Sequence, residues 1–129
     1  MLAEYIKELE DDLKINELNL KDYQLRLPAI KHKWAGRLIR LKMEVAQDTR
    51  KLTTLKNTLA EEVKKSASVV LTLPAIAKVV EVRPEITEMQ QSIDEKKLVI
   101  ELLEKTEKTL SSATFDIKNL IEIMKLEIT

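Results

Sequence analysis

Residues 28–66 decide the fold, and they read PAIKHKWAGRLIRLKMEVAQDTRKLTTLKNTLAEEVKKS. The proline at the start suits the first turn of a helix, where its missing N–H costs nothing. After it, apolar residues recur at steps of three, four and seven: Ile30, Trp34, Leu38, Leu41, Val45, Leu52, Leu55, Leu59 and Val63. This spacing is a heptad seam with one gap, at Asp48, and it predicts a long helix over 28–66 that pairs with another long helix.

Helical spacing continues on both sides of this stretch. Residues 1–15 place apolar side chains three and four apart and predict a short acidic helix, followed by a connector at 16–19. The Ser-Ser-Ala-Thr run at 111–114 predicts a weakened or bent stretch, followed by a short last helix. Between them, a second heptad series predicts a long helix over 84–113: Ile86, Met89, Ile93, Ile100, Leu103 and Leu110.

The conformation of residues 67–83 is ambiguous. Their valines favour a strand, whereas Thr72 before Pro74 fits the N-cap of a short helix. We favour an irregular link that leads into a short helix. The sequence therefore predicts one all-α domain over residues 1–129, with an acidic N-terminal helix at 1–15, a basic helix at 28–66, a link at 67–83 and a helical C-terminal segment at 84–129.

The residue inventory excludes most kinds of catalytic site. Among 129 residues there is no cysteine, one glycine and one histidine, His32. Disulfides, thiol chemistry, glycine-rich phosphate loops and multi-histidine metal sites are therefore excluded, and we expect no enzyme activity, no metal and no cofactor. The N-terminus lacks the apolar core of a signal peptide, and no apolar run reaches the ~18 residues of a membrane span, so we expect a soluble cytoplasmic protein.

The charges are balanced in total but unevenly distributed. The chain holds 22 basic and 22 acidic residues, yet residues 26–65 hold eleven basic and four acidic ones, a net charge of +7. Residues 1–25 carry −4 and residues 66–129 carry −3. A basic stripe on a long helix can follow a phosphate backbone, because each contact releases a condensed counterion. It can equally be a solvated helix face whose lysines pair with acidic neighbours.

Seven cations of the basic helix are candidates for phosphate contacts. Those along one flank of the apolar seam are Lys33, Arg37, Arg40 and Lys51. Those towards the other sides of the helix are Lys42, Arg50 and Lys56. The place of Trp34 on the seam favours core packing over stacking on a base.

Three stretches of the chain follow one another in a recognisable order. The acidic helix ends with LEDDLKI at 9–15, and the start of the basic helix lies in LRLPAIKHKW at 25–34. The C-terminal segment contains TFDIKNLIE at 114–122. In order and spacing, over nearly the whole chain, these stretches resemble the UvsY-type recombination mediators of T-even-type phages.

This resemblance implies a homo-oligomeric ring, a heptamer in the family, that binds single-stranded DNA without catalysis. Such mediators promote loading of a UvsX-like phage recombinase onto strands covered by phage single-strand-binding protein. They act in phage DNA recombination, repair and replication, in the cytoplasm of the infected bacterial host.

The resemblance also implies roles for particular residues. In the family a Lys-x-Arg element contributes to DNA binding, and the matching stretch LKNTL at 55–59 keeps Lys56 but has threonine in place of the arginine. The family's C-terminal segment mediates assembly. Carried over to this chain, that role falls within 84–129 on Phe115, Ile117, Leu120, Ile121 and Met124.

A second hypothesis stays open at this point. A coiled-coil scaffold or adaptor, whose basic helix docks on an acidic protein partner, has the same composition and the same segregation of charge. DNA binding that falls steeply with salt distinguishes the mediator from the scaffold.

Overall fold

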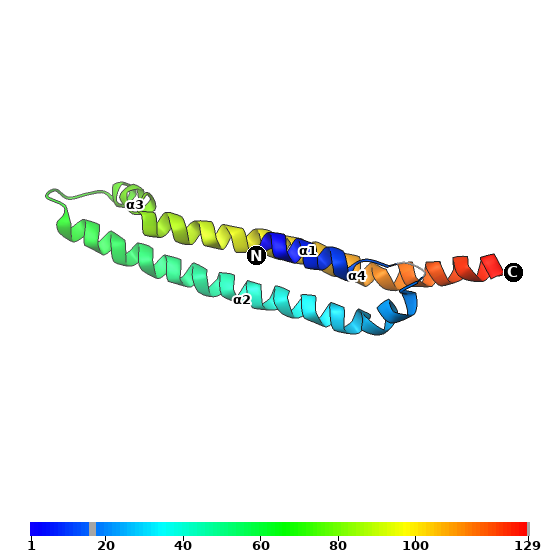
Figure 1. The fold of residues 1–129 in the computed structure, drawn as a ribbon. Helices are drawn as coiled ribbons and strands as arrows, with labels where there is room; N and C mark the ends of the chain where they lie inside the picture. The colour runs from blue at the N-terminus through cyan, green and yellow to red at the C-terminus, as the bar shows by residue number, and fades with distance from the viewer. Residues whose placement is uncertain (16–17, 129) are drawn as a thin grey trace. The chain divides into compact units, whose positions relative to one another are not determined.

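The computed structural model describes residues 1–15 and 18–128, and these form four α-helices (Figure 1). The helices are α1 (Leu2–Asp12), α2 (Leu20–Ser66), α3 (Leu73–Glu81) and α4 (Pro84–Ile128). The described part of the chain contains no strand, which confirms the all-α prediction. Residues 16 and 17 of the predicted connector lie outside the described residues.

Helix α2 begins at Leu20, and the predicted start at Pro28 was wrong. Pro28 lies inside the helix, where it cannot donate a hydrogen bond to the carbonyl of Gln24. Three buried side chains, Leu20, Tyr23 and Leu27, continue the three-and-four spacing of the seam upstream of the proline. Their burial offsets the lost hydrogen bond, because each large apolar side chain removed from water contributes about 1.5–3 kcal/mol.

Helix α4 continues to Ile128, so the predicted end of the long helix at residue 113 and the separate last helix were also wrong. The hydroxyl of Ser111 donates to the carbonyl of Glu107, and that of Ser112 donates to the carbonyl of Thr109. Both hydroxyls thus bond to carbonyls of their own helix, which tolerates these local hydrogen bonds without ending there. Between the serines and Ile117, Ala113 is buried and keeps the helix packed.

Helix α3 confirms the prediction of a short helix at the end of the link. The hydroxyl of Thr72 accepts a hydrogen bond from the backbone N–H of Ala75, and Pro74 follows in the first turn. This is the arrangement that an N-cap threonine and an early proline favour.

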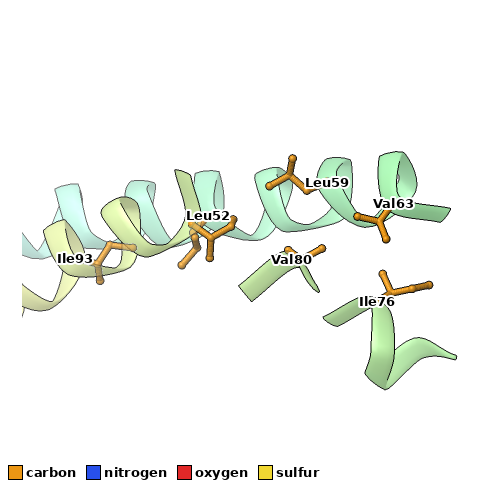
Figure 2. Packing of buried hydrophobic residues seen from close by; sticks show 7 residues of the cluster. Leu52, Leu59, Val63, Ile76, Val80 and Ile93 are labelled. Carbon is orange, nitrogen blue, oxygen red and sulfur yellow. The ribbon is translucent and has the colours of Figure 1, made fainter. Parts of the chain in front are cut away.

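Two parts of the chain each form a compact unit, and we describe them separately. The first comprises Met1–Arg40 and Leu98–Thr129, and the second comprises Leu41–Lys97. The second unit is built on a cluster of apolar side chains from α2, α3 and α4, with Ile76 and Val80 of α3 turned towards α2 (Figure 2). Its buried members are Leu52, Leu59, Val63, Ile76, Val80, Ile86 and Ile93.

An ion pair fills the gap in the heptad seam of the second unit. The Nζ of Lys96 on α4 lies 2.7 Å from a carboxylate oxygen of Asp48 and 3.4 Å from one of Glu44. The side chains of Lys96 and Asp48 are 22% and 23% exposed, so the pair lies at the edge of the core.

The first unit is built on the upstream half of the same seam. Its buried residues from α2 are Leu20, Tyr23, Leu27, Ile30, Trp34 and Leu38. Those from α4 are Val99, Leu103, Thr106, Leu110, Ala113 and Ile117. Val99 takes the core position that the sequence assigned to Ile100, which is half-buried. Helix α1 contributes one buried side chain, Leu9.

Candidate nucleic-acid interface

All seven candidate phosphate contacts lie on α2, but the structure places them in different environments. Lys33 and Arg37 face the acidic helix α1 within the first unit. Arg40 is exposed, and its Nε donates to the carbonyl of Gly36 at 3.3 Å. The remaining four, Lys42, Arg50, Lys51 and Lys56, lie in the second unit.

Lys33 and Arg37 form a compact ion cluster with Glu8 and Asp12. The Nζ of Lys33 lies 2.6 Å from Asp12 Oδ2 and 3.0 Å from Glu8 Oε1. The guanidinium of Arg37 donates to the other oxygen of Glu8 at 2.6 Å. Each helix supplies residues four apart, which share one helix face, so two carboxylates meet two cations.

Two aromatic rings complete this cluster. The indole N–H of Trp34 donates to Asp12 Oδ2 at 2.8 Å, and the ring itself is fully buried. The Arg37 guanidinium lies 4.7 Å from the ring centroid of Trp34 and 5.1 Å from that of Tyr5, within the range of cation–π contacts. Tyr5 meets Trp34 edge to face, with centroids 5.5 Å apart. Trp34 is therefore a core residue, as its position on the seam predicts.

The ionisation of the cluster follows from these contacts. Hydrogen bonds from Arg37 and Lys33 lower the pKa of Glu8 below its ordinary value of 4.5. Burial acts to lower the pKa of Lys33, but the hydrogen bonds to Asp12 and Glu8 outweigh it and leave that pKa raised. The hydrogen bond to Glu8 likewise raises the pKa of Arg37. Both cations and the Glu8 carboxylate are thus held in their charged forms at neutral pH.

Two cations of the second unit lack such acidic partners among the described residues. Arg50 and Lys51 are exposed, and neither forms an ion pair with any residue that the structure describes. They line a shallow hollow on one face of α2 together with Gln47, Thr54, Leu55 and Thr58. No carboxylate lines this hollow among the described residues, so its net charge is positive.

Lys42 and Lys56 lie outside this hollow. Lys42 is exposed and Lys56 is half-buried, and neither is among the residues that line it. The structure thus brings Arg50 and Lys51 together on one face and separates them from Lys56.

The five residues expected to mediate assembly differ in exposure. Phe115 is 69% exposed, whereas Ile117 is buried in the core of the first unit. Leu120, Ile121 and Met124 are half-buried. Further exposed apolar side chains lie near the end of α4, among them Ile123 and Ile128.

Sequence reasoning missed the acidic half of the cluster, Glu8 and Asp12. Glu8 and Asp12 are four residues apart on α1, as Lys33 and Arg37 are on α2. This matching spacing is the sequence feature from which the ion cluster could have been predicted. The same reasoning missed Tyr5, for which the sequence carries no comparable signal.

In the part of the chain that the structure describes, no three histidine, aspartate or glutamate side chains gather as metal ligands would. None of the helices, over their described residues, is both long enough and apolar enough to cross a membrane.

Comparison with known proteins establishes the fold. No protein-family model and no curated protein matches the sequence. Among solved structures, the chain is similar to the crystal structure of the recombination mediator protein UvsY of bacteriophage T4. The TM-score is 0.84 at 14% sequence identity, and the match covers 98% of each chain. The chain therefore has a UvsY-type fold, which confirms the architecture that the sequence resemblance implied.

Proposed function

We propose that this chain with a UvsY-type fold is a non-catalytic recombination mediator. In this proposal it binds single-stranded DNA and promotes loading of a phage recombinase onto strands covered by single-strand-binding protein. The observation that carries the proposal is the match to the T4 recombination mediator, with a TM-score of 0.84 over 98% of both chains. The cationic face of α2 supplies the chemistry that such a role requires.

The DNA contacts of this proposal begin at Arg50 and Lys51. Their exposed charges have no acidic partner among the described residues, so a phosphate does not have to displace a carboxylate to reach them. The hollow around them adds threonine hydroxyls and the aliphatic side chain of Leu55, none of which selects among bases. Arg40, Lys42 and Lys56 extend the set of phosphate contacts along α2. Binding of this kind is tolerant of sequence and strongly dependent on salt.

Assembly multiplies these contacts. Exposed apolar side chains towards the end of α4, Phe115 and Ile123 among them, supply a surface that a neighbouring subunit can bury. A closed ring, a heptamer in this proposal, repeats the Arg50–Lys51 face once in every subunit. Linked sites bind one strand with an avidity well above the affinity of each site.

The DNA-binding part is tested with a fluorescent oligonucleotide titrated at several salt concentrations. We expect affinity to fall steeply with salt. Replacing Arg50 and Lys51 by alanine should flatten the slope of log affinity against log salt by about 1.4, since each single-strand phosphate contact contributes ~0.7. The matched control, Lys97→Ala with Lys108→Ala, removes the same charge from α4 and should leave the slope close to that of the wild type.

Two further outcomes decide between the functions. Native mass spectrometry that finds a discrete oligomer, in a protein that binds no oligonucleotide at low salt, supports the scaffold with an acidic protein partner and overturns the mediator. If DNA binds, the chain should shorten the lag of recombinase filament assembly on oligonucleotides covered by single-strand-binding protein. An unchanged lag contradicts the mediator function while leaving the DNA binding intact.

A further inference from the structure

The cluster between α1 and α2 already holds two cations of the basic helix against two anions. Lys33 and Arg37 make three contacts of 2.6–3.0 Å with the carboxylates of Glu8 and Asp12. Carboxylate and phosphate oxygens are alternative partners for the same guanidinium and ammonium groups. Helix α1 thus occupies these cations in the way that a phosphate backbone would.

The cluster lies at the surface, where a competing anion can reach it. The side chains of Lys33 and Arg37 are 33% and 24% exposed, and that of Glu8 is 38% exposed, whereas that of Asp12 is 15% exposed. A competing anion therefore reaches the Glu8 side of the cluster first. Because phosphate oxygens satisfy the same two cations as carboxylate oxygens, exchange of one anion for the other keeps both positive charges paired.

Helix α1 is weakly attached in other respects. It has 11 residues, and Leu9 is its one buried side chain. Two other apolar side chains of α1, Leu2 and Ile6, are 38% and 41% exposed. A helix of this length is marginal without tertiary contacts, so the loss of a few contacts is enough to release it.

We propose that α1 is a displaceable acidic cover: single-stranded DNA replaces Glu8 and Asp12 on Lys33 and Arg37 and releases α1 from α2. The inference rests on the proposed DNA binding and adds to it that part of the interface is closed before DNA arrives. Lys33 and Arg37 then contact the strand as it displaces α1 within the first unit. Release of α1 also uncovers the indole of Trp34, whose N–H loses its partner Asp12.

The cover is tested by neutralising its two carboxylates. The variant Glu8→Gln with Asp12→Asn should bind a fluorescent oligonucleotide at least about threefold more tightly, because the three ion pairs of the cluster no longer oppose the strand. Its slope of log affinity against log salt should stay close to that of the wild type, because Lys33 and Arg37 contact the same number of phosphates in both complexes. Adding Lys33→Ala and Arg37→Ala to this variant should remove the gain in affinity and flatten the slope by about 1.4.

The matched control is Glu10→Gln with Asp11→Asn. It removes the same charge from the same helix, but Glu10 is exposed and Asp11 pairs with Lys14 at 3.4 Å, outside the cluster. If the gain in DNA affinity reflects only the loss of negative charge, both variants gain equally. If α1 is a specific cover, only Glu8→Gln with Asp12→Asn gains affinity.

Hydrogen exchange on the wild-type protein provides a test that needs no substitution. Saturation with oligonucleotide should speed exchange of the α1 amides while it slows exchange around Arg50 and Lys51. The proposed cover is overturned if DNA binds the two carboxylate-neutralised variants with equal affinity and exchange in α1 is unchanged or slower. The proposed function stands in that case. If no variant binds DNA, the proposed function fails and the cover fails with it.

Discussion

The ion pair in the heptad gap should contribute more to stability than a surface pair, and a double-mutant cycle measures the difference. Lys96 Nζ lies 2.7 Å from Asp48, and both side chains are less than a quarter exposed. The hydrogen bond to Asp48 raises the pKa of Lys96. We expect a coupling energy of about 1 kcal/mol, at the upper end of the range for exposed pairs. That corresponds to a factor of about five in the folding equilibrium constant.

The cycle comprises Asp48→Ala, Lys96→Ala and the double substitution, each unfolded in urea at one protein concentration so that assembly contributes equally. Glu44 stays 3.4 Å from Lys96 in the first variant and limits its cost, since the cation keeps a partner. The control cycle on Glu101 and Lys105, which lie 3.7 Å apart with side chains 62% and 76% exposed, should give about 0.3 kcal/mol.

A second prediction concerns replacement of the Asp48–Lys96 pair by apolar side chains. The double variant Asp48→Leu with Lys96→Leu completes the heptad seam with side chains that need no partner. It should be at least as stable as the wild type, because replacing a partly buried ion pair by packed apolar residues is often neutral or stabilising. A coupling energy equal to that of the control pair, or a leucine variant that unfolds at lower urea, refutes the assignment of this pair to the seam.

Three further predictions concern single positions. Gly36→Ala should stabilise the protein by about 0.5–1 kcal/mol in urea unfolding, because Gly36 lies inside α2 and an added Cβ meets only an Arg40 nitrogen at 3.8 Å; a destabilised variant contradicts this. Leu103→Ala, at a fully buried position, should cost about 2–5 kcal/mol, whereas Leu98→Ala, at a position 56% exposed, should change thermal stability little. Because the folded-state pKa of Glu8 is lowered, its contribution to stability is complete above its ordinary pKa of 4.5 and is lost as the pH falls through the lowered value. Fluorescence of the single tryptophan, Trp34, should report that loss on acidification, and Glu8→Gln should abolish this component.

Periodicity was sufficient to predict the seam of α2 but not its start. Every apolar seam residue from Ile30 to Val63 is buried or half-buried, because the three-and-four spacing dictates which face a helix can bury. The local signal of Pro28 was misleading, since Leu20 and Tyr23 are buried in the fold upstream of the proline and keep that part of the chain helical. Tertiary packing overrode local propensity in the same way at Ser111 and Ser112.

The candidate site was predictable only in part. Charge segregation pointed to α2, and the structure places Arg50 and Lys51 on an exposed cationic face of that helix. The pairing of Lys33 with Glu8 spans 25 residues of sequence, and no periodic pattern reports which helix docks on which. The sequence shows which charged residues a helix carries. Whether each of them is paired with a residue of another helix or exposed to solvent depends on the tertiary fold.

A phosphate first meets the cations that are not already paired with a carboxylate, so this pairing matters more than the net charge of the chain. Lys96 is held by Asp48 and Glu44 within the second unit, and Lys33 and Arg37 are held by α1 within the first. Each such pair removes a positive charge from the set that DNA can reach without competition. The neutral total of 22 basic and 22 acidic residues is therefore compatible with DNA binding, because among the described residues no carboxylate lines the hollow that holds Arg50 and Lys51. On this reasoning, neutralising Glu8 and Asp12 enlarges the proposed interface, whereas neutralising Asp48 leaves Lys96 with its second partner, Glu44, and weakens the core without adding an available cation.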